Sequence, residues 1–203
     1  DNMAGILKVD TLQRVGSDSD QITLSAGSVN IPSGNVLSGA DVGSLTAPGV
    51  FINAVSASKT DSQANATNDS FTDIAGLSVT ITPKSTSSKI LLLCNLSISG
   101  GDDATGRAFK VLRGSTPVGV GSEGSRTPVS FFGSPMSGDT NMAGTTSWHY
   151  LDSPNTTSAI TYKVQMTGFN AGVTTYINTN ISRGGQAYDD IASSNFTAIE
   201  IAG

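Results

Sequence analysis

A single histidine limits the catalytic chemistry available to this chain. His149 is the only histidine in the sequence, which excludes a metal site built from several imidazoles. A Ser-His-Asp triad would need a distant serine and aspartate to converge on it. In the segment Thr146-Ser-Trp-His-Tyr-Leu151, strict alternation places His149 on the opposite strand face from Trp148 and Tyr150. We therefore predict a packed or surface histidine and no catalytic residue.

Carboxylates are the second candidates, because carboxylate pairs hydrolyse glycosidic bonds and carboxylate oxygens bind calcium. Most lie in polar or glycine-rich segments, where aspartate commonly serves turns. None has the spacing of an Asp-x-Asp-x-Asp-Gly calcium loop. We predict turn residues, with no metal and no cofactor. Calcium binding by a loop cluster stays open, and glycan depolymerase activity stays a minor alternative. The residues concerned are Asp18, Asp20, Asp102, Asp103, Asp139, Asp152, Asp189 and Asp190.

Aromatic side chains in loops are the residues best suited to contact the face of a sugar ring. Phe131, Phe132 and Tyr188 stand among glycine, serine and polar residues, where loops are expected. These three are our candidates for surface ligand contacts. The alternative is that they plug the end of a small barrel or a seam between subunits.

The composition is that of a folding chain without a nucleic-acid or membrane signature. Of 203 residues, 37% are hydrophobic and 13% are charged, and the formal net charge is -5. The 11 basic residues are scattered, which disfavours nucleic acid as a partner. The longest apolar run, Ile90 to Cys94, is far below the about 20 residues of a membrane span.

We expect no secretory signal, because no basic segment precedes an apolar core at the start. Cys94, the only cysteine, excludes an internal disulfide and is predicted to be a core thiol.

The sequence pattern predicts an all-β fold. No stretch has the i, i+3, i+4, i+7 spacing of an amphipathic helix. Short β-rich runs recur about every 8–12 residues, separated by Gly, Pro, Asn and Asp, as in sandwiches and barrels. We expect residues 51–203 to form an antiparallel β-sandwich of the jelly-roll type. The predicted strands are Phe51–Ser58, Leu77–Thr82, Lys89–Ser99, Arg107–Arg113, Val118–Gly121, Val129–Phe132, Thr145–Leu151, Ala159–Thr167, Thr174–Ile181 and Asn195–Ala202.

Two segments predict association between chains. Residues 16–50 carry sparse apolar pairs separated by turn formers, so they form either an extended β shaft shared between chains or a flexible linker. Residues 1–15 are predicted to be an attachment strand. The continuous apolar run from Ile90 to Cys94 predicts a strand covered on both faces. Together these patterns predict a homotrimer.

The last segment alternates in polarity up to Gly203, as a strand tied into a sheet would. Thr197, Ile199 and Ile201 share one strand face. We predict an interior strand that closes the sandwich, with the two isoleucines buried.

Four segments carry a resemblance to a known group of proteins. They are Met3-Ala-Gly-Ile-Leu-Lys-Val-Asp-Thr-Leu-Gln13, Ile81-Thr-Pro-Lys-Ser-Thr-Ser-Ser-Lys-Ile-Leu91, Asp152-Ser-Pro-Asn-Thr-Thr-Ser-Ala-Ile-Thr-Tyr-Lys-Val-Gln165 and Phe196-Thr-Ala-Ile-Glu-Ile-Ala-Gly203. With them the chain resembles tail-fibre-like virion proteins of tailed bacteriophages, common in phages of aquatic bacteria.

The resemblance implies a non-enzymatic trimer in the virion, with a jelly-roll head similar to the tumour-necrosis-factor and complement globular-head class. The N-terminal attachment element would use Ile6, Leu7, Val9 and Leu12. The length suits a short fibre or spike that binds a host surface, a glycan being one option. The alternative is a capsid decoration protein that stabilises or ornaments the phage head. The expected partners are further copies of the chain and other virion proteins.

Overall fold

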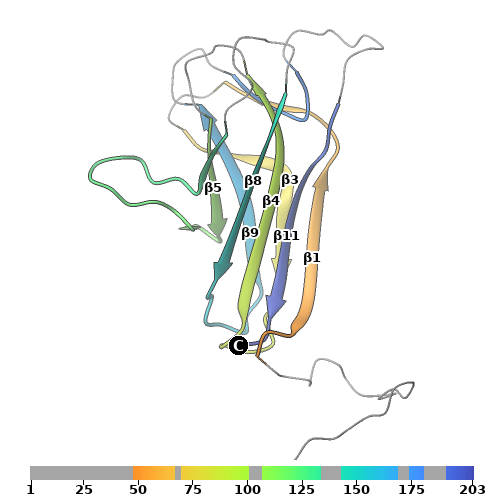
Figure 1. Cartoon of the computed structure of the whole chain (residues 1–203), viewed down its shortest axis with the longest axis vertical. Helices are drawn as coiled ribbons and strands as arrows, with labels where there is room; N and C mark the ends of the chain where they lie inside the picture. The colour runs from red at the N-terminus through yellow and green to blue at the C-terminus, as the bar shows by residue number, and fades with distance from the viewer. Residues whose placement is uncertain (1–47, 67–69, 101–106, 134–142, 169–173, 181–190) are drawn as a thin grey trace, which may run out of the picture. The chain divides into compact units, whose positions relative to one another are not determined.

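The structure is a computed structural model that describes residues 48–66, 70–100, 107–133, 143–168, 174–180 and 191–203 (Figure 1). Strands are the only regular elements in these ranges, as the sequence pattern predicted. Their bounds are β1 (Phe51–Lys59), β2 (Gln63–Asn65), β3 (Thr72–Ile81), β4 (Lys89–Gly100), β5 (Arg107–Arg113), β6 (Thr116–Val118), β7 (Phe131–Gly133), β8 (Gly144–Asp152), β9 (Ile160–Gly168), β10 (Thr175–Ile177) and β11 (Ser194–Ile201).

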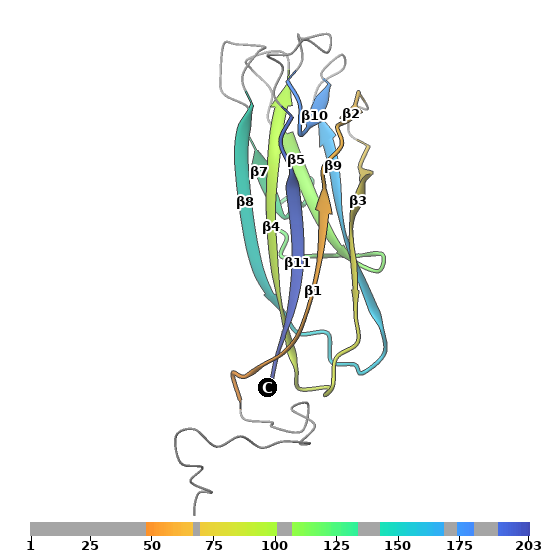
Figure 2. The ribbon, with the colours of Figure 1, turned by 90° about the vertical axis from the view of Figure 1, so that its right-hand side faces the viewer.

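The strands form two antiparallel sheets that face each other (Figures 1 and 2). In the first, sheet A, the long strands follow the order β1-β11-β4-β8. The short strand β10 continues beyond β11 along β4, and β2 pairs with β10. In sheet B the order is β3-β9-β5, and both β6 and β7 pair with β5. Successive long strands mostly switch between the sheets, which is the topology of a jelly roll.

Alternation along the strands explains the core. Because successive side chains of a strand point to opposite faces, every second residue of the central strands is apolar and faces the other sheet. Sheet A contributes Ile90, Leu92, Cys94, Leu96, Ile98, Phe196 and Ala198, and sheet B contributes Leu77, Val79, Ile81, Phe109, Val111, Tyr162, Val164 and Met166, all of them buried.

Strand bounds depart from the prediction where alternation is weak. β3 begins at Thr72 rather than Leu77. Gly76 (φ 84°) lies at a break in the register of β3 with β9, so the alternation that predicted a strand from Leu77 does not continue back through it. The predicted strand Val118–Gly121 is wrong, since β6 ends at Val118 and Gly119 (φ 59°) leaves the extended conformation. β10 is also shorter than expected, and β2 was not predicted at all.

The C-terminal strand is interior, as predicted, but its faces are reversed. β11 lies between β1 and β4. Phe196 is opposite Cys94 in this register, so Phe196 points into the core, whereas Ile199 and Ile201 are only partly buried on the outer side. The prediction that both isoleucines are core residues is therefore wrong. Glu200 can occupy an inner position because its Oε1 accepts hydrogen bonds from the Lys84 N–H (2.6 Å) and the Ser88 hydroxyl (2.7 Å).

The two ends of the described chain meet at one end of the sandwich. The Gly49 N–H donates to the Ala202 carbonyl (2.8 Å), and the Ala202 N–H donates to the Val50 carbonyl (2.8 Å). Figure 2 shows this end beside the label of the C-terminus. The chain therefore enters the sandwich where β11 finishes.

Replacing Phe196 with alanine should lower the free energy of unfolding by about 3–5 kcal/mol, because it removes a fully buried ring and leaves a cavity. The control is Thr80→Ala, which removes an exposed hydroxyl hydrogen-bonded to Thr161 (2.8 Å) and should cost less than about 1 kcal/mol. Urea unfolding followed by circular dichroism measures both. Equal losses would show that Phe196 does not lie on the core face.

Candidate functional site

The outer face of sheet A is the most unusual surface of the sandwich. The cross-strand register aligns its side chains in rows that run across all four long strands. The row nearest the C-terminal end is apolar, the next is mixed and the third is polar. These rows are Ala54, Ile199, Leu91 and Leu151; then Ser56, Thr197, Leu93 and His149; then Ser58, Asn195, Asn95 and Ser147.

This surface, the uncharged face hereafter, lacks acidic side chains. Its one constitutively charged residue is Lys89, whose ammonium donates to the Ser153 hydroxyl (2.8 Å). The other charged residues of the four long strands, Lys59, Asp152 and Glu200, are buried. Leu93 is nevertheless 39% exposed, and Phe51, which pairs with Ile201 beside the apolar row, is 67% exposed.

The outer face of sheet B has the opposite character. The Lys163 ammonium lies 2.8 Å from a carboxylate oxygen of Asp73, and the Gln165 amide donates to the other oxygen (2.7 Å). The hydrogen bond from Lys163 lowers the pKa of Asp73 below its usual value. Lys110 lies over the ring of Phe71 at 3.9 Å from its centroid. The outer face of β3, β9 and β5 thus carries charged and polar side chains, unlike the outer face of sheet A.

His149 lies on the uncharged face, opposite Trp148 and Tyr150 as predicted. It lines a shallow depression of about 280 Å³, together with Leu93, Asn95, Ser147, Asn195 and Thr197. No titratable group of the described residues lines this depression beside it except the buried Cys94 thiol. Among the described residues, His149 therefore has no carboxylate beside it in this depression.

The candidate contact residues Phe131 and Phe132 have different environments. Phe131 is buried, so its assignment as a surface contact is wrong. It begins β7, and its ring stacks between Phe109 (centroids 4.9 Å apart) and Trp148 (5.7 Å). Trp148 stacks in turn on Tyr150 (5.8 Å). This aromatic stack joins β5 and β7 of sheet B to β8 of sheet A and closes that edge of the sandwich.

Phe132 is 64% exposed, as alternation along β7 requires. It lines a second hollow, the Phe132 pocket, of about 220 Å³. The other lining residues are Gly121, Ser122, Glu123, Arg126, Thr127, Pro128 and Val129, all from the loop between β6 and β7. Sequence reasoning missed Glu123 and Arg126, because only the path of this loop brings them near Phe132. Tyr188 lies outside the described residues.

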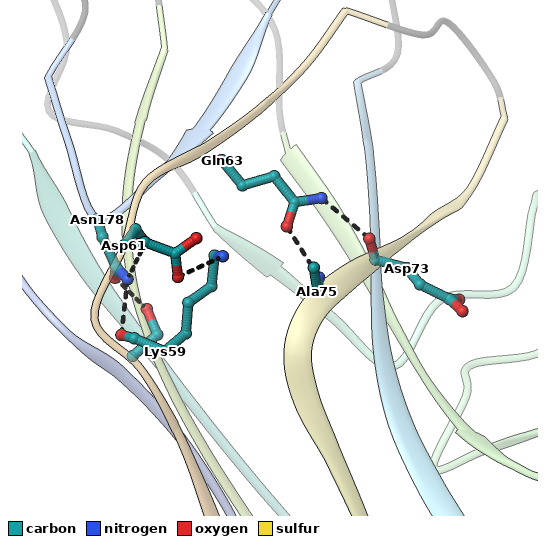
Figure 3. A network of polar contacts seen from close by, with 7 residues as sticks. Lys59, Asp61, Gln63, Asp73, Ala75 and Asn178 are labelled. Atoms are coloured by element: carbon teal, nitrogen blue, oxygen red, sulfur yellow. Dashed lines mark hydrogen bonds and ion pairs between the residues drawn. The ribbon is translucent and has the colours of Figure 1, made fainter.

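A polar network fastens the far end of β1 (Figure 3). Asn178, buried at φ 65°, donates from Nδ2 to the carbonyls of Lys59 (2.8 Å) and Asp61 (3.0 Å) and accepts from the Ser194 hydroxyl (2.6 Å). The Lys59 ammonium donates to Asp61 (2.9 Å) and lowers the pKa of that carboxyl group. Close by, the Gln63 amide bridges the Asp73 carbonyl and the Ala75 N–H. This network holds strand ends together.

Asp152 belongs to a second structural cluster rather than to a loop. It ends β8 and is buried, with its carboxylate accepting from Arg113 Nη1 (3.0 Å) and from the Tyr162 hydroxyl (2.6 Å). Burial raises the pKa of Tyr162, and the hydrogen bond from its hydroxyl to Asp152 raises this pKa further. The remaining predicted turn carboxylates (Asp18, Asp20, Asp102, Asp103, Asp139, Asp189 and Asp190) lie outside the described residues. In the part that the structure describes, no three His, Cys, Asp or Glu side chains are grouped to hold a metal ion.

Asn178→Ala should lower the free energy of unfolding by about 2–4 kcal/mol, since it removes three hydrogen bonds and leaves alanine, which adopts a positive φ less readily than asparagine, at this position. Asn178→Gly loses the same bonds but tolerates the backbone conformation, so its loss should be about 1 kcal/mol smaller. Denaturant unfolding of both variants measures the difference. An alanine variant as stable as the glycine variant would contradict the left-handed backbone at this position.

Cys94 should not react with Ellman's reagent at pH 8 in the folded protein. The thiol is buried, and burial raises its pKa to about 12, so almost none is present as the reactive thiolate. Absorbance should report no modification in buffer and one thiol per chain in urea. Stoichiometric reaction of the folded protein within minutes would contradict a core position.

The predicted attachment residues Ile6, Leu7, Val9 and Leu12 lie outside the described residues, as does the whole of residues 1–47. Across the described ranges, no helix combines the length and apolarity that crossing a bilayer requires. No model of a known protein family matches this chain, and a search of curated proteins finds no match either.

Proposed function

We propose that this chain is a structural protein of a bacteriophage virion: a short homotrimeric fibre or spike, anchored by its N-terminal segment, whose jelly-roll head binds the host surface. The sequence resemblance suggests the phage particle. The observation that carries the proposal of self-association is the uncharged face of sheet A.

Covering the uncharged face is favourable for two reasons. Its apolar row and Phe51 expose hydrophobic area that water penalises, and contiguous exposed patches of this kind mark interaction sites. It also carries almost no charge, and depletion of charged residues distinguishes interface cores from ordinary surface. A second copy of the same chain supplies a matching surface without another partner, and the resemblance to tail-fibre-like proteins implies three copies.

Three linked heads would bind a host surface with avidity. Binding rather than catalysis is proposed, because the buried Asp152 carboxylate is held by Arg113 and Tyr162, and one oxygen of the buried Glu200, Oε1, is held by Lys84 and Ser88 while the other has no hydrogen-bond partner among the described residues.

The virion assignment is tested by gold-labelled antibodies on intact particles. Label near the tail supports a fibre or spike, whereas label spread over the capsid would point to a decoration protein. Particles without label would remove the virion assignment.

Leu93→Asp should convert the assembled protein into monomers, because the aspartate would have to lose its hydration in the covered face at a cost of several kcal/mol. Analytical ultracentrifugation should give the parent protein three times the chain mass of 20.6 kDa and the variant one chain mass. Thr80→Asp, on the outer face of sheet B, is the control and should leave the mass unchanged. A monomeric parent at micromolar concentration, or full assembly of Leu93→Asp, would refute the proposed interface.

A further inference from the structure

The loop between β6 and β7 is held in a defined shape at its base. The loop spans residues 119–130 and projects from the sandwich, to the left in Figure 1. Near its end, the Ser130 hydroxyl donates to the Val118 carbonyl (2.8 Å) and accepts from the Val111 N–H (2.9 Å). The Gly121 N–H also donates to the Val129 carbonyl (3.2 Å), across the loop.

The start of the loop packs on the aromatic stack. A Cβ at Gly119 would lie 2.5 Å from the Trp148 ring and 3.0 Å from the Tyr150 ring, so only glycine allows this approach. Its positive φ imposes the same requirement. With both ends fixed, the hollow beside the loop exists before any ligand arrives, and preformed sites lose less entropy on binding.

The Phe132 pocket is lined by both apolar and charged side chains. Phe132 supplies an exposed ring, and Pro128 and Val129 add apolar surface. The Arg126 guanidinium lies 3.0 Å from the Glu123 carboxylate, and both side chains are largely exposed. The pair offers hydrogen-bond donors and acceptors side by side, and its charges cancel.

This combination selects the chemical class of ligand. Because the charges of Glu123 and Arg126 offset each other, the pair favours neither an anionic nor a cationic ligand. It can still donate hydrogen bonds to, and accept them from, the hydroxyl groups of a ligand. The exposed ring favours a flat apolar face. The volume, about 220 Å³, is below the about 300–1,000 Å³ of sites for drug-sized ligands, so it suits one ring. A pyranose sugar has hydroxyl groups on its edge and C–H groups on its face.

We propose that the Phe132 pocket binds a single neutral pyranose residue of a glycan, with the sugar face on Phe132 and its hydroxyl groups on Glu123 and Arg126. This inference rests on the proposed host-binding role and names its ligand class. One such contact is weak, and three copies on one assembly would give useful avidity.

Saturation-transfer NMR on the full chain tests the proposal with four free sugars as probes: glucose, galactose, mannose and N-acetylglucosamine. At least one should receive saturation, most strongly at the C–H protons of one ring face. Phe132→Ala should abolish the signal. Gly121→Phe should also weaken it, because it adds a ring at a residue that lines the pocket, and the added Cβ meets no atom within 4 Å.

The control is Phe51→Ala, which removes an exposed aromatic ring from β1 in sheet A, the sheet to which β7 does not belong, and should leave the signal intact. Combining Glu123→Gln with Arg126→Gln should weaken binding about tenfold, the effect of losing charge-assisted hydrogen bonds worth about 1.4 kcal/mol. Absence of signal from all four sugars, or a signal that survives in both Phe132→Ala and Gly121→Phe, overturns the proposal.

The assembly state is measured on the same samples, which separates the two proposals. A trimer that binds none of the sugars leaves self-association standing and removes the sugar site. A monomer whose sugar signal depends on Phe132 removes self-association and keeps the site.

Discussion

The structure depends on the pairing of β4 with its neighbours on both edges. β11 and β10 pair along one edge and β8 along the other, so the longest strand lies at the centre of sheet A. Its inner residues, Ile90 to Ile98 at every second position, provide much of the core. Because side chains alternate, the same pairing necessarily presents Leu91 and Leu93 outward. The pairing that buries the inner side chains of β4 in the core therefore also places its outer side chains on the uncharged face.

The sequence predicted the fold class and the long strands because their polarity alternates over many residues. Arg107–Arg113 was predicted with the observed bounds, and the strands from Lys89 and Phe51 were predicted to within one residue. The three-residue strands were missed or misplaced, since so short a segment carries no period. Residues 1–47 lie outside the described ranges, so the shaft and the attachment strand stay predictions.

Alternation also separates residues into two faces without indicating which face is inside. For β11 the prediction chose Ile199 and Ile201, but the register with β4 turns Phe196 inward. Phe131 and Phe132 were likewise both candidates for surface contacts, but the pairing of β7 with β5 buries Phe131 and leaves Phe132 outside. The run Ile90 to Cys94 was expected to be covered on both faces, and within one chain only the inner face is covered. The uncharged face could not be predicted from the sequence, because it depends on which strands share a sheet and on which face of each strand is inside.

The position of β11 between β1 and β4 has a consequence for the order of events during folding. Ser56 and Thr197, which share a hydrogen bond, are 141 residues apart in the chain, so joining their strands closes a very long loop. Contacts of such high sequence separation form slowly, whereas the β5–β6 hairpin is local and forms early. Until β11 inserts, β1 and β4 present unpaired backbone edges, and the row containing Ile199 and Leu91 does not exist. In the proposed assembly, each chain would therefore complete its own sheet before it associates with another copy, and a chain delayed at that step would be prone to aggregation through its unpaired strand edges.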